Sequence, residues 1–181
     1  MLQRLLIARA ATALLLSAIT VVAENDTQPS AALLQGKITY RPPPDDAWER
    51  AHNVSGETAA AYVSESRQGA IAIEVLPADA RITPAMGPAI VRTLRQNHKN
   101  AGQKVIMDPK VERDSRFALR VHEKYQQGDN IADELHLYRD LGPRVVMVTA
   151  NAMGKESNDA KAVHKAGEEV LLSAKWMKPK K

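Results

Sequence analysis

The sequence predicts an α+β domain in which a central antiparallel sheet is flanked by two main helices. Three observations support this fold class. Short segments with alternating apolar and polar residues follow one another with only brief turns between them, which favours antiparallel pairing. Two further stretches carry apolar residues at helical spacing. The order along the chain is strands, helix, strands, helix, so each helix can cover the sheet separately.

The first expected elements are a short strand and a hairpin. Residues 37–41 can form a strand, which Pro42-Pro43-Pro44 would end because proline cannot donate to a strand ladder. Trp48 follows and is expected in the core. Ala59 to Glu65 and Ala70 to Leu76 are expected to pair across a four-residue turn, and the second of them presents one apolar face.

The first helix is expected from Ala85 to Asn100. Thr83 can cap its start, and Pro84 suits the first helical position because its missing N–H has no partner there. Asn100-Ala101-Gly102 is a typical helix end. The apolar residues at helical spacing are Met86, Ile90, Val91 and Leu94.

A run of strands follows and leads into a second helix. The turns between these strands are rich in Gly, Asp, Asn and Pro. The expected strands are Val105 to Met107, Lys110 to Glu112, Ser115 to Tyr125, Ile131 to Tyr138 and Arg144 to Thr149. Ser157-Asn158-Asp159 can cap the second helix, which would turn Ala160, Val163, Gly167, Val170 and Leu171 toward the sheet.

The N-terminal 23 residues have the pattern of a secretory signal peptide. Arg4 and Arg9 precede an apolar run over 10–22, and Val21-Val22-Ala23 is a small-residue exit. That run is shorter than the roughly 20 residues that span a bilayer, and no second run of that length follows. The expected organisation is a signal peptide at 1–23, a flexible lead at 24–36, a single α+β domain at 37–177 and a basic tail at 178–181. The product is expected in the periplasm or outside the cell.

Composition excludes several classes of function. Removal of the signal peptide would lower the formal charge from +4 to +2, and no basic stripe suited to nucleic acid is visible. There is no cysteine, which removes thiol chemistry, disulfides and a lipid anchor on an N-terminal cysteine. Aromatic residues make up 4% of the chain, too few for a stacking platform. No catalytic or cofactor-binding motif is present, so no cofactor is expected. Because the protein is expected to be exported, its partner is expected to be another exported or envelope protein.

Several of these segments together resemble a known family. The hairpin Tyr62 to Leu76, the helix Ala85 to Asn100, and the strands Phe117 to Glu123 and Arg144 to Thr149 carry the resemblance. The run from Gly69 to Trp176 is similar to the α/β/α sandwich shared by PsbP-type extrinsic photosystem proteins, the Ran-binding Mog proteins and related secreted bacterial domains of unknown function. The resemblance implies a binding or accessory role, and no catalytic residue is carried over with it.

The best polar group lies on two neighbouring strands. If the turn between them centres near Gln127 and Gly128, we expect strand alternation to place three polar residues of each strand on the same face of the sheet. The six residues are Arg120, His122 and Lys124, and Glu134, His136 and Tyr138. His122, Glu134 and His136 could then hold a divalent metal such as zinc, with one position left for water.

Other interpretations of these residues remain open. Cross-strand ion pairs between Arg120, Lys124 and Glu134 on a solvated face would explain the same pattern. A second alternative is a calcium site of Asp129, Asp133 and Glu134 at the turn. A hydrolytic triad of Ser157, Asp159 and His164 is excluded because all three lie in one short helical stretch.

Two functions are therefore predicted as alternatives. The first is an exported, non-enzymatic binding or accessory protein that acts through a surface for a protein or a small ligand. The second is a divalent-metal-binding or metal-dependent protein that uses His122, Glu134 and His136.

Overall fold

The structure is a computed structural model and describes residues 31–51, 59–154 and 160–177. The predicted signal peptide at 1–23, the basic tail at 178–181 and the helix cap at 157–159 lie outside the described residues. Among the helices of the described residues, none combines the length and the apolar character that crossing a membrane requires.

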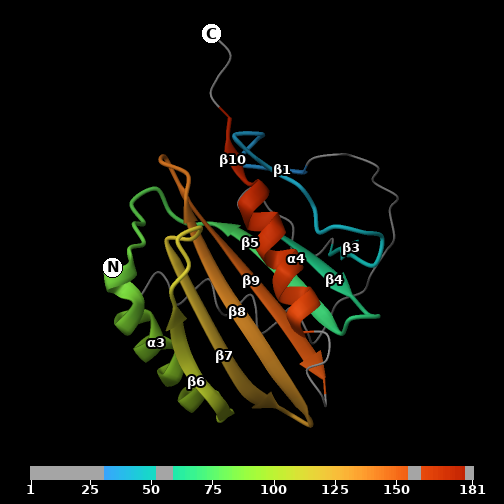
Figure 1. The fold of residues 1–181 in the computed structure, drawn as a ribbon, viewed down its shortest axis with the longest axis vertical. Helices are drawn as coiled ribbons and strands as arrows, with labels where there is room; N and C mark the ends of the chain where they lie inside the picture. Colours follow the sequence, from blue (N-terminus) through green and yellow to red (C-terminus); the bar gives the residue numbers. More distant parts are fainter. Residues whose placement is uncertain (1–30, 52–58, 155–159, 178–181) are drawn as a thin grey trace.

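The described chain is organised around a seven-stranded antiparallel sheet (Figure 1). Its strand order is β3-β4-β5-β9-β8-β7-β6, so strands that follow one another in sequence are neighbours except where β5 meets β9. The strands are β3 (Glu49–Arg50), β4 (Ala59–Ser64), β5 (Gly69–Val75), β6 (Lys104–Glu112), β7 (Leu119–Gln127), β8 (Asn130–Asp140) and β9 (Val145–Gly154).

Two helices pack on opposite faces of this sheet. Helix α3 (Gly87–Asn100) packs mainly against β6 and β7, whereas α4 (Ala160–Ser173) packs mainly against β9, β5 and β8. Strand β9 shows the division, because Val145 and Met147 join the core beneath α3 while Val146 and Val148 join the core beneath α4. The predicted class, a central antiparallel sheet between two main helices, is confirmed.

Each helix buries the stripe that its spacing predicts. Ile90 and Leu94 of α3 are buried, and so are Val163, Val170 and Leu171 of α4. Gly167 lets α4 approach the sheet closely, since a Cβ atom there would lie 2.7 Å from the Cβ atom of Ala150 on β9. Trp48 is also in the core, as expected.

The folded part begins earlier than residue 37. Strand β1 (Ala31–Leu33) pairs with β2 (Ile38–Tyr40), and β10 (Lys175–Trp176) pairs with the other side of β2 in a separate three-stranded sheet. Leu33 is buried, which gives β1 an apolar anchor. The expectation of a flexible lead up to residue 36 is therefore wrong for its last residues.

Several element boundaries also differ from the expectation, among them the start of β7, which lies at Leu119 rather than Ser115. The two strands expected at 105–107 and 110–112 are one strand, β6, with register shifts between Val105 and Lys110. Thr83 caps a 3-10 turn (Pro84–Met86) without a side-chain hydrogen bond, and α3 begins only at Gly87. Strand β9 continues to Gly154 rather than Thr149, because β5 and β8 pair with it on both sides.

Candidate functional site

The pairing of β7 with β8 decides which of the candidate residues meet. Gln127 is opposite Asn130, so the turn consists of Gly128 and Asp129. Gly128 has a φ of 61°, which suits the first position of a two-residue hairpin turn. Each even-numbered residue of β7 is therefore opposite an odd-numbered residue of β8.

This pairing separates the predicted metal ligands. Residues directly opposite each other on neighbouring strands share a face of the sheet, and successive residues of one strand alternate between the two faces. Glu134 is opposite Glu123, and both lie on the face that α3 covers. His122 is opposite Leu135, which belongs to the core beneath α4. The prediction that His122, Glu134 and His136 form one site is therefore wrong.

The two alternatives for this region fail for the same reason. Glu134 and His136 are 5% and 2% exposed, so they do not belong to a solvated face with Arg120 and Lys124. Asp133 and Glu134 are neighbours in β8 and point to opposite faces, so they cannot join in one calcium site at the turn.

Glu134 and His136 belong to a buried polar group that we call the sealed cluster: His98, Glu123, Tyr125, Glu134 and His136. Glu123 is its centre and is fully buried. One carboxylate oxygen of Glu123 lies 2.9 Å from Nε2 of His98 on α3, and the other lies 2.9 Å from Nε2 of His136 on β8. The Tyr125 hydroxyl donates to Glu134 Oε2 over 2.6 Å. The sealed cluster thus ties α3 to β7 and β8.

Further polar residues surround the sealed cluster. Nδ1 of His98 lies 2.8 Å from Gln103 Oε1, and Nδ1 of His136 lies 3.3 Å from the Thr149 hydroxyl. Asn151 donates to Glu134, while its side-chain oxygen Oδ1 is buried and has no hydrogen-bond partner among the described residues. A buried carboxylate is costly unless it is hydrogen-bonded, and these contacts meet that requirement for Glu123 and Glu134.

Sequence reasoning did not connect His98 with Glu123, although each carried a signal. His98 continues the buried stripe of Ile90 and Leu94 by one helical step of four residues. Glu123 alternates with Val121 and Tyr125 on the buried face of β7. A charged residue at a core position on each of two elements is the pattern that predicts such a pair.

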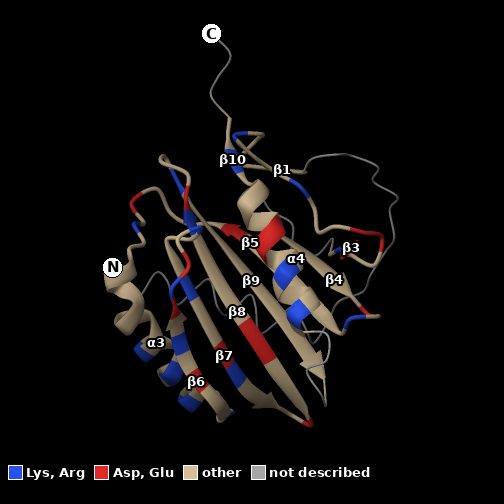
Figure 2. Cartoon of the chain, viewed as in Figure 1, with Lys and Arg blue, Asp and Glu red and all other residues tan. Residues whose placement is uncertain are grey.

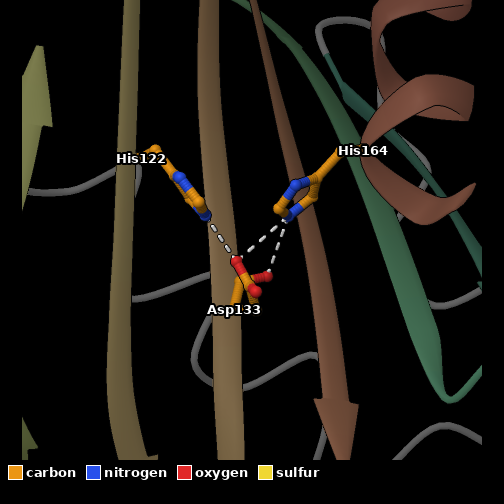
Figure 3. Close-up of side chains that lie close together, drawn as sticks. All are labelled: His122, Asp133 and His164. Atoms are coloured by element: carbon orange, nitrogen blue, oxygen red, sulfur yellow. Dashed lines mark hydrogen bonds and ion pairs between the residues drawn. The ribbon is translucent and has the colours of Figure 1, made fainter. Parts of the chain in front are cut away.

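The opposite face of the same strands holds a second group, which we call the open cluster: His122 of β7, Asp133 of β8 and His164 of α4. Both imidazoles present Nε2 to one oxygen of Asp133, as Figure 3 shows. Asp133 Oδ1 lies 2.6 Å from Nε2 of His122 and 3.5 Å from Nε2 of His164. His164 Nε2 is also 3.1 Å from the backbone carbonyl of Asp133.

Electrostatics favour an ionised Asp133 and a neutral His164. Burial alone would raise the pKa of Asp133, but hydrogen bonds from His122 and Lys124 outweigh it and hold that pKa below its ordinary value. Lys124 Nζ lies 2.6 Å from the second oxygen of Asp133. Burial lowers the pKa of His164, because the charged imidazolium loses hydration beside α4.

Ion pairs extend the open cluster across the sheet. Glu112 of β6 accepts from Arg120 and lies 3.5 Å from Nδ1 of His122. Arg120 also contacts Glu168 of α4, which Arg116 approaches as well. We call this surface the open face; it consists of Glu112, Asp114, Arg116, Arg120, His122, Lys124, Asp133, His164 and Glu168. Figure 2 shows residues of both charges on β6, β7, β8 and α4.

The open face exists because the helices are offset. Helix α4 covers the middle of the sheet, whereas α3 covers β6 and β7 on the other side. The α4 side of β6 and β7 therefore stays partly accessible, and alternate residues of β7 there are polar: Arg120, His122 and Lys124. Such a surface can form hydrogen bonds and ion pairs with a partner, and its imidazoles can coordinate a metal.

Comparison with known proteins identifies a shared fold but no family. A scan of protein-family models finds no match to this sequence, and a search of curated proteins finds none either. Among solved structures, a point mutant of the protein Mog1 matches with a TM-score of 0.52 and 12% identity, over 83% of this chain and 96% of the other. The Ran-binding protein Mog1p of Saccharomyces cerevisiae matches with a TM-score of 0.51 and 11% identity, over 86% of this chain and 95% of the other.

A third structure is more distant. LpqN, described as involved in cell envelope biogenesis of Mycobacterium tuberculosis, matches with a TM-score of 0.45 and 13% identity, over 88% of this chain and 90% of the other. The Mog1 structures show that this chain shares their α+β fold, and at such low identity they show nothing beyond the fold.

Proposed function

We propose that this chain is an exported, non-enzymatic binding or accessory protein that holds another exported or envelope protein on its open face. The observation that carries the proposal is the open face itself: a polar surface of both charges on three rigid strands, bordered by α4 and left partly accessible. Ordered charged groups on strands suit recognition, because complementary charges steer a partner and fix its register.

Arg116 is the residue best placed to reach a partner. Its side chain is 50% exposed while it contacts Asp114 and Glu168 at the rim of the open face. Arginine presents several donors in a planar fork, so one face of the group can stay paired within the chain while the other binds a carboxylate of the partner.

The fold supports the proposal by analogy only. A matching structure is named a Ran-binding protein, which is consistent with a fold that presents a surface to another protein. The partner of that protein is not transferred to this chain. The N-terminal pattern at 1–23 supports export, and protein recovered from the host is expected to begin at or close to Glu24.

Site-specific photocrosslinking in the host tests the proposal. A photoreactive amino acid replaces Arg116 in one variant and Arg95 in another. The control is closely matched, because Arg95 is 52% exposed and pairs with a single aspartate, Asp108, but lies on α3 on the far side of the sheet. We expect position 116 to capture one protein of the envelope fraction and position 95 not to.

Two outcomes would contradict the proposal. One is an equal set of crosslinked products at positions 116 and 95. The other is a wild-type chain that is recovered only from the cytoplasm with Met1 intact, because no exported partner could then meet it.

A further inference from the structure

The open cluster contains two imidazoles that converge on one carboxylate oxygen, although each comes from a different element. We propose that His122, Asp133 and His164 bind one divalent transition-metal ion of the zinc type. This inference goes beyond the binding of a protein partner and does not depend on it.

The spacing of the ligand atoms fits such an ion. Zinc binds imidazole nitrogen and carboxylate oxygen at about 2.0–2.2 Å, which places two ligands of a tetrahedral site about 3.3 Å apart. His164 Nε2 is 3.5 Å from Asp133 Oδ1, and all three ligand atoms lie within 4.8 Å of one another. His122 Nε2 is closer to the oxygen, at 2.6 Å, and a small rotation of its ring would admit the ion.

A carboxylate behind His122 supports the same conclusion. Glu112 Oε1 lies 3.5 Å from Nδ1 of His122, on the side away from Asp133. Metal-binding histidines commonly donate their second N–H to a carboxylate, which fixes the tautomer and directs a lone pair at the metal. Nε2 of His122 forms a hydrogen bond with Asp133 Oδ1 over 2.6 Å, and an ion would take the place of the proton between these two atoms while Nδ1–H of His122 faces Glu112.

The open face carries both charges in balance. Its four carboxylates are Glu112, Asp114, Asp133 and Glu168, and its permanent cations are Arg116, Arg120 and Lys124 together with the neighbouring Lys110, which is paired opposite His122. With both imidazoles neutral, no excess positive charge opposes an ion. The neutral imidazole is the form that coordinates metal.

Lys124 opposes the ion but does not block it. Its ammonium group contacts Oδ2 of Asp133, which leaves Oδ1 to the two imidazoles. The Lys124 side chain is 28% exposed, so it can turn toward solvent when an ion arrives. The side chains of His122 and His164 are 21% and 12% exposed, which leaves a coordination position open to water.

The sealed cluster offers a weaker alternative. Glu123, Glu134 and His136 also have ligand atoms within 4.8 Å of one another. They lie beneath α3, and hydrogen bonds from Tyr125, Asn151 and His98 already engage their carboxylates. The open cluster therefore carries the proposal.

Zinc titration tests it on protein purified from cells that express the full chain and then dialysed against a chelator. Isothermal titration with Zn²⁺ should show one ion per chain in the wild type. Binding should disappear in His164→Ala and in the conservative variant Asp133→Asn. Glu112→Gln should weaken binding about 10–100-fold through loss of the contact behind His122, whereas Lys124→Met should strengthen it several-fold.

Two controls make the result decisive. Glu169→Gln removes an exposed carboxylate of α4 outside the cluster and should leave zinc affinity unchanged. In the wild type, nitrogen NMR of the imidazoles should show chemical-shift changes for His122 and His164 on addition of Zn²⁺ and none for His98 and His136. This measurement does not depend on the folding of any variant. Absence of zinc binding in the folded wild type would overturn the proposal, and so would shifts confined to the sealed cluster.

Discussion

The two faces of the β7–β8 hairpin carry similar polar side chains, but these side chains differ in how deeply they are buried. Beneath α3, two glutamates and two histidines are buried in the sealed cluster, where Glu123 is hydrogen-bonded to both histidines and Glu134 to Tyr125 and Asn151. Beside α4, two histidines keep partial contact with water around a buried aspartate and join a wider set of ion pairs. The residue types barely differ, so the helix that covers each face decides whether a polar group stabilises the fold or remains available for binding.

This comparison predicts a large difference between two glutamates. Glu123→Ala would leave His98 and His136 buried without their shared acceptor, and removal of one partner from a buried pair costs about 3–5 kcal/mol. Glu112→Ala, on the open face, should cost under about 1 kcal/mol because water can replace the carboxylate. Urea denaturation measures both, and similar losses would mean that the two faces are not different environments.

The second prediction asks whether both helices are true covering layers. Leu94→Ala on α3 and Leu171→Ala on α4 each remove a buried leucine and should cost about 2–5 kcal/mol. The exposed neighbours Arg95 and Lys165 are the controls, and their alanine variants should change stability little. An unchanged denaturation midpoint for either leucine variant would show that its helix does not cover the sheet.

The third prediction compares one histidine from each face. His136→Ala leaves Glu123 short of one hydrogen bond in a buried setting, so a loss of about 1–3 kcal/mol is expected. His122→Ala should change stability by less than about 1 kcal/mol in metal-free protein, since Asp133 keeps its contacts with Lys124 and His164 and Glu112 is 33% exposed. Thermal melts in the presence of a chelator provide the measurement, and a reversed order would contradict the burial that separates the clusters.

The smallest effect is expected at Glu74, a carboxyl group of β5 on the α3 side. Burial raises its pKa above the ordinary 4.5, so the fold favours its protonated form. Its contribution to stability is therefore present at low pH and is lost as pH rises through the folded pKa. Glu74→Gln should be slightly more stable than the wild type at pH 7, and the difference should vanish by about pH 4.

The exposed Glu169→Gln is the control for this pH dependence. Its stability relative to the wild type should be nearly the same at pH 7 and at pH 4. Denaturation midpoints measured at both values decide the question, and a constant difference for Glu74→Gln would remove burial as the cause.

Several features of the fold could be predicted from local pattern. Alternation in β5 and helical spacing in α3 and α4 identified the elements and their buried faces, because these periods follow from backbone geometry. Strands β1 and β10 were not predicted. Each has only two or three residues, and their pairing with β2 joins the two ends of the described chain.

The candidate site shows where prediction from the sequence stopped. The polar residues of β7 and β8 were recognised, but the assumed pairing of the two strands put Glu134 and His136 on the face of His122, whereas the observed pairing puts them on the opposite face. His98 and His164 lie on helices, and no spacing in the sequence relates a helix to a particular strand. Both clusters depend on such contacts between elements.

The sequence by itself thus determined the fold class, the apolar stripes of both helices and the polar character of the β7–β8 hairpin. These properties are local, since each depends on residues within a few positions of one another. Only the tertiary structure decided the register of the hairpin, the face that each helix covers and hence the division into a sealed and an open cluster. The reason is that the burial of a residue depends on which element packs over it. Glu123 and His122 are adjacent in the chain, yet their side chains lie on opposite faces of the sheet.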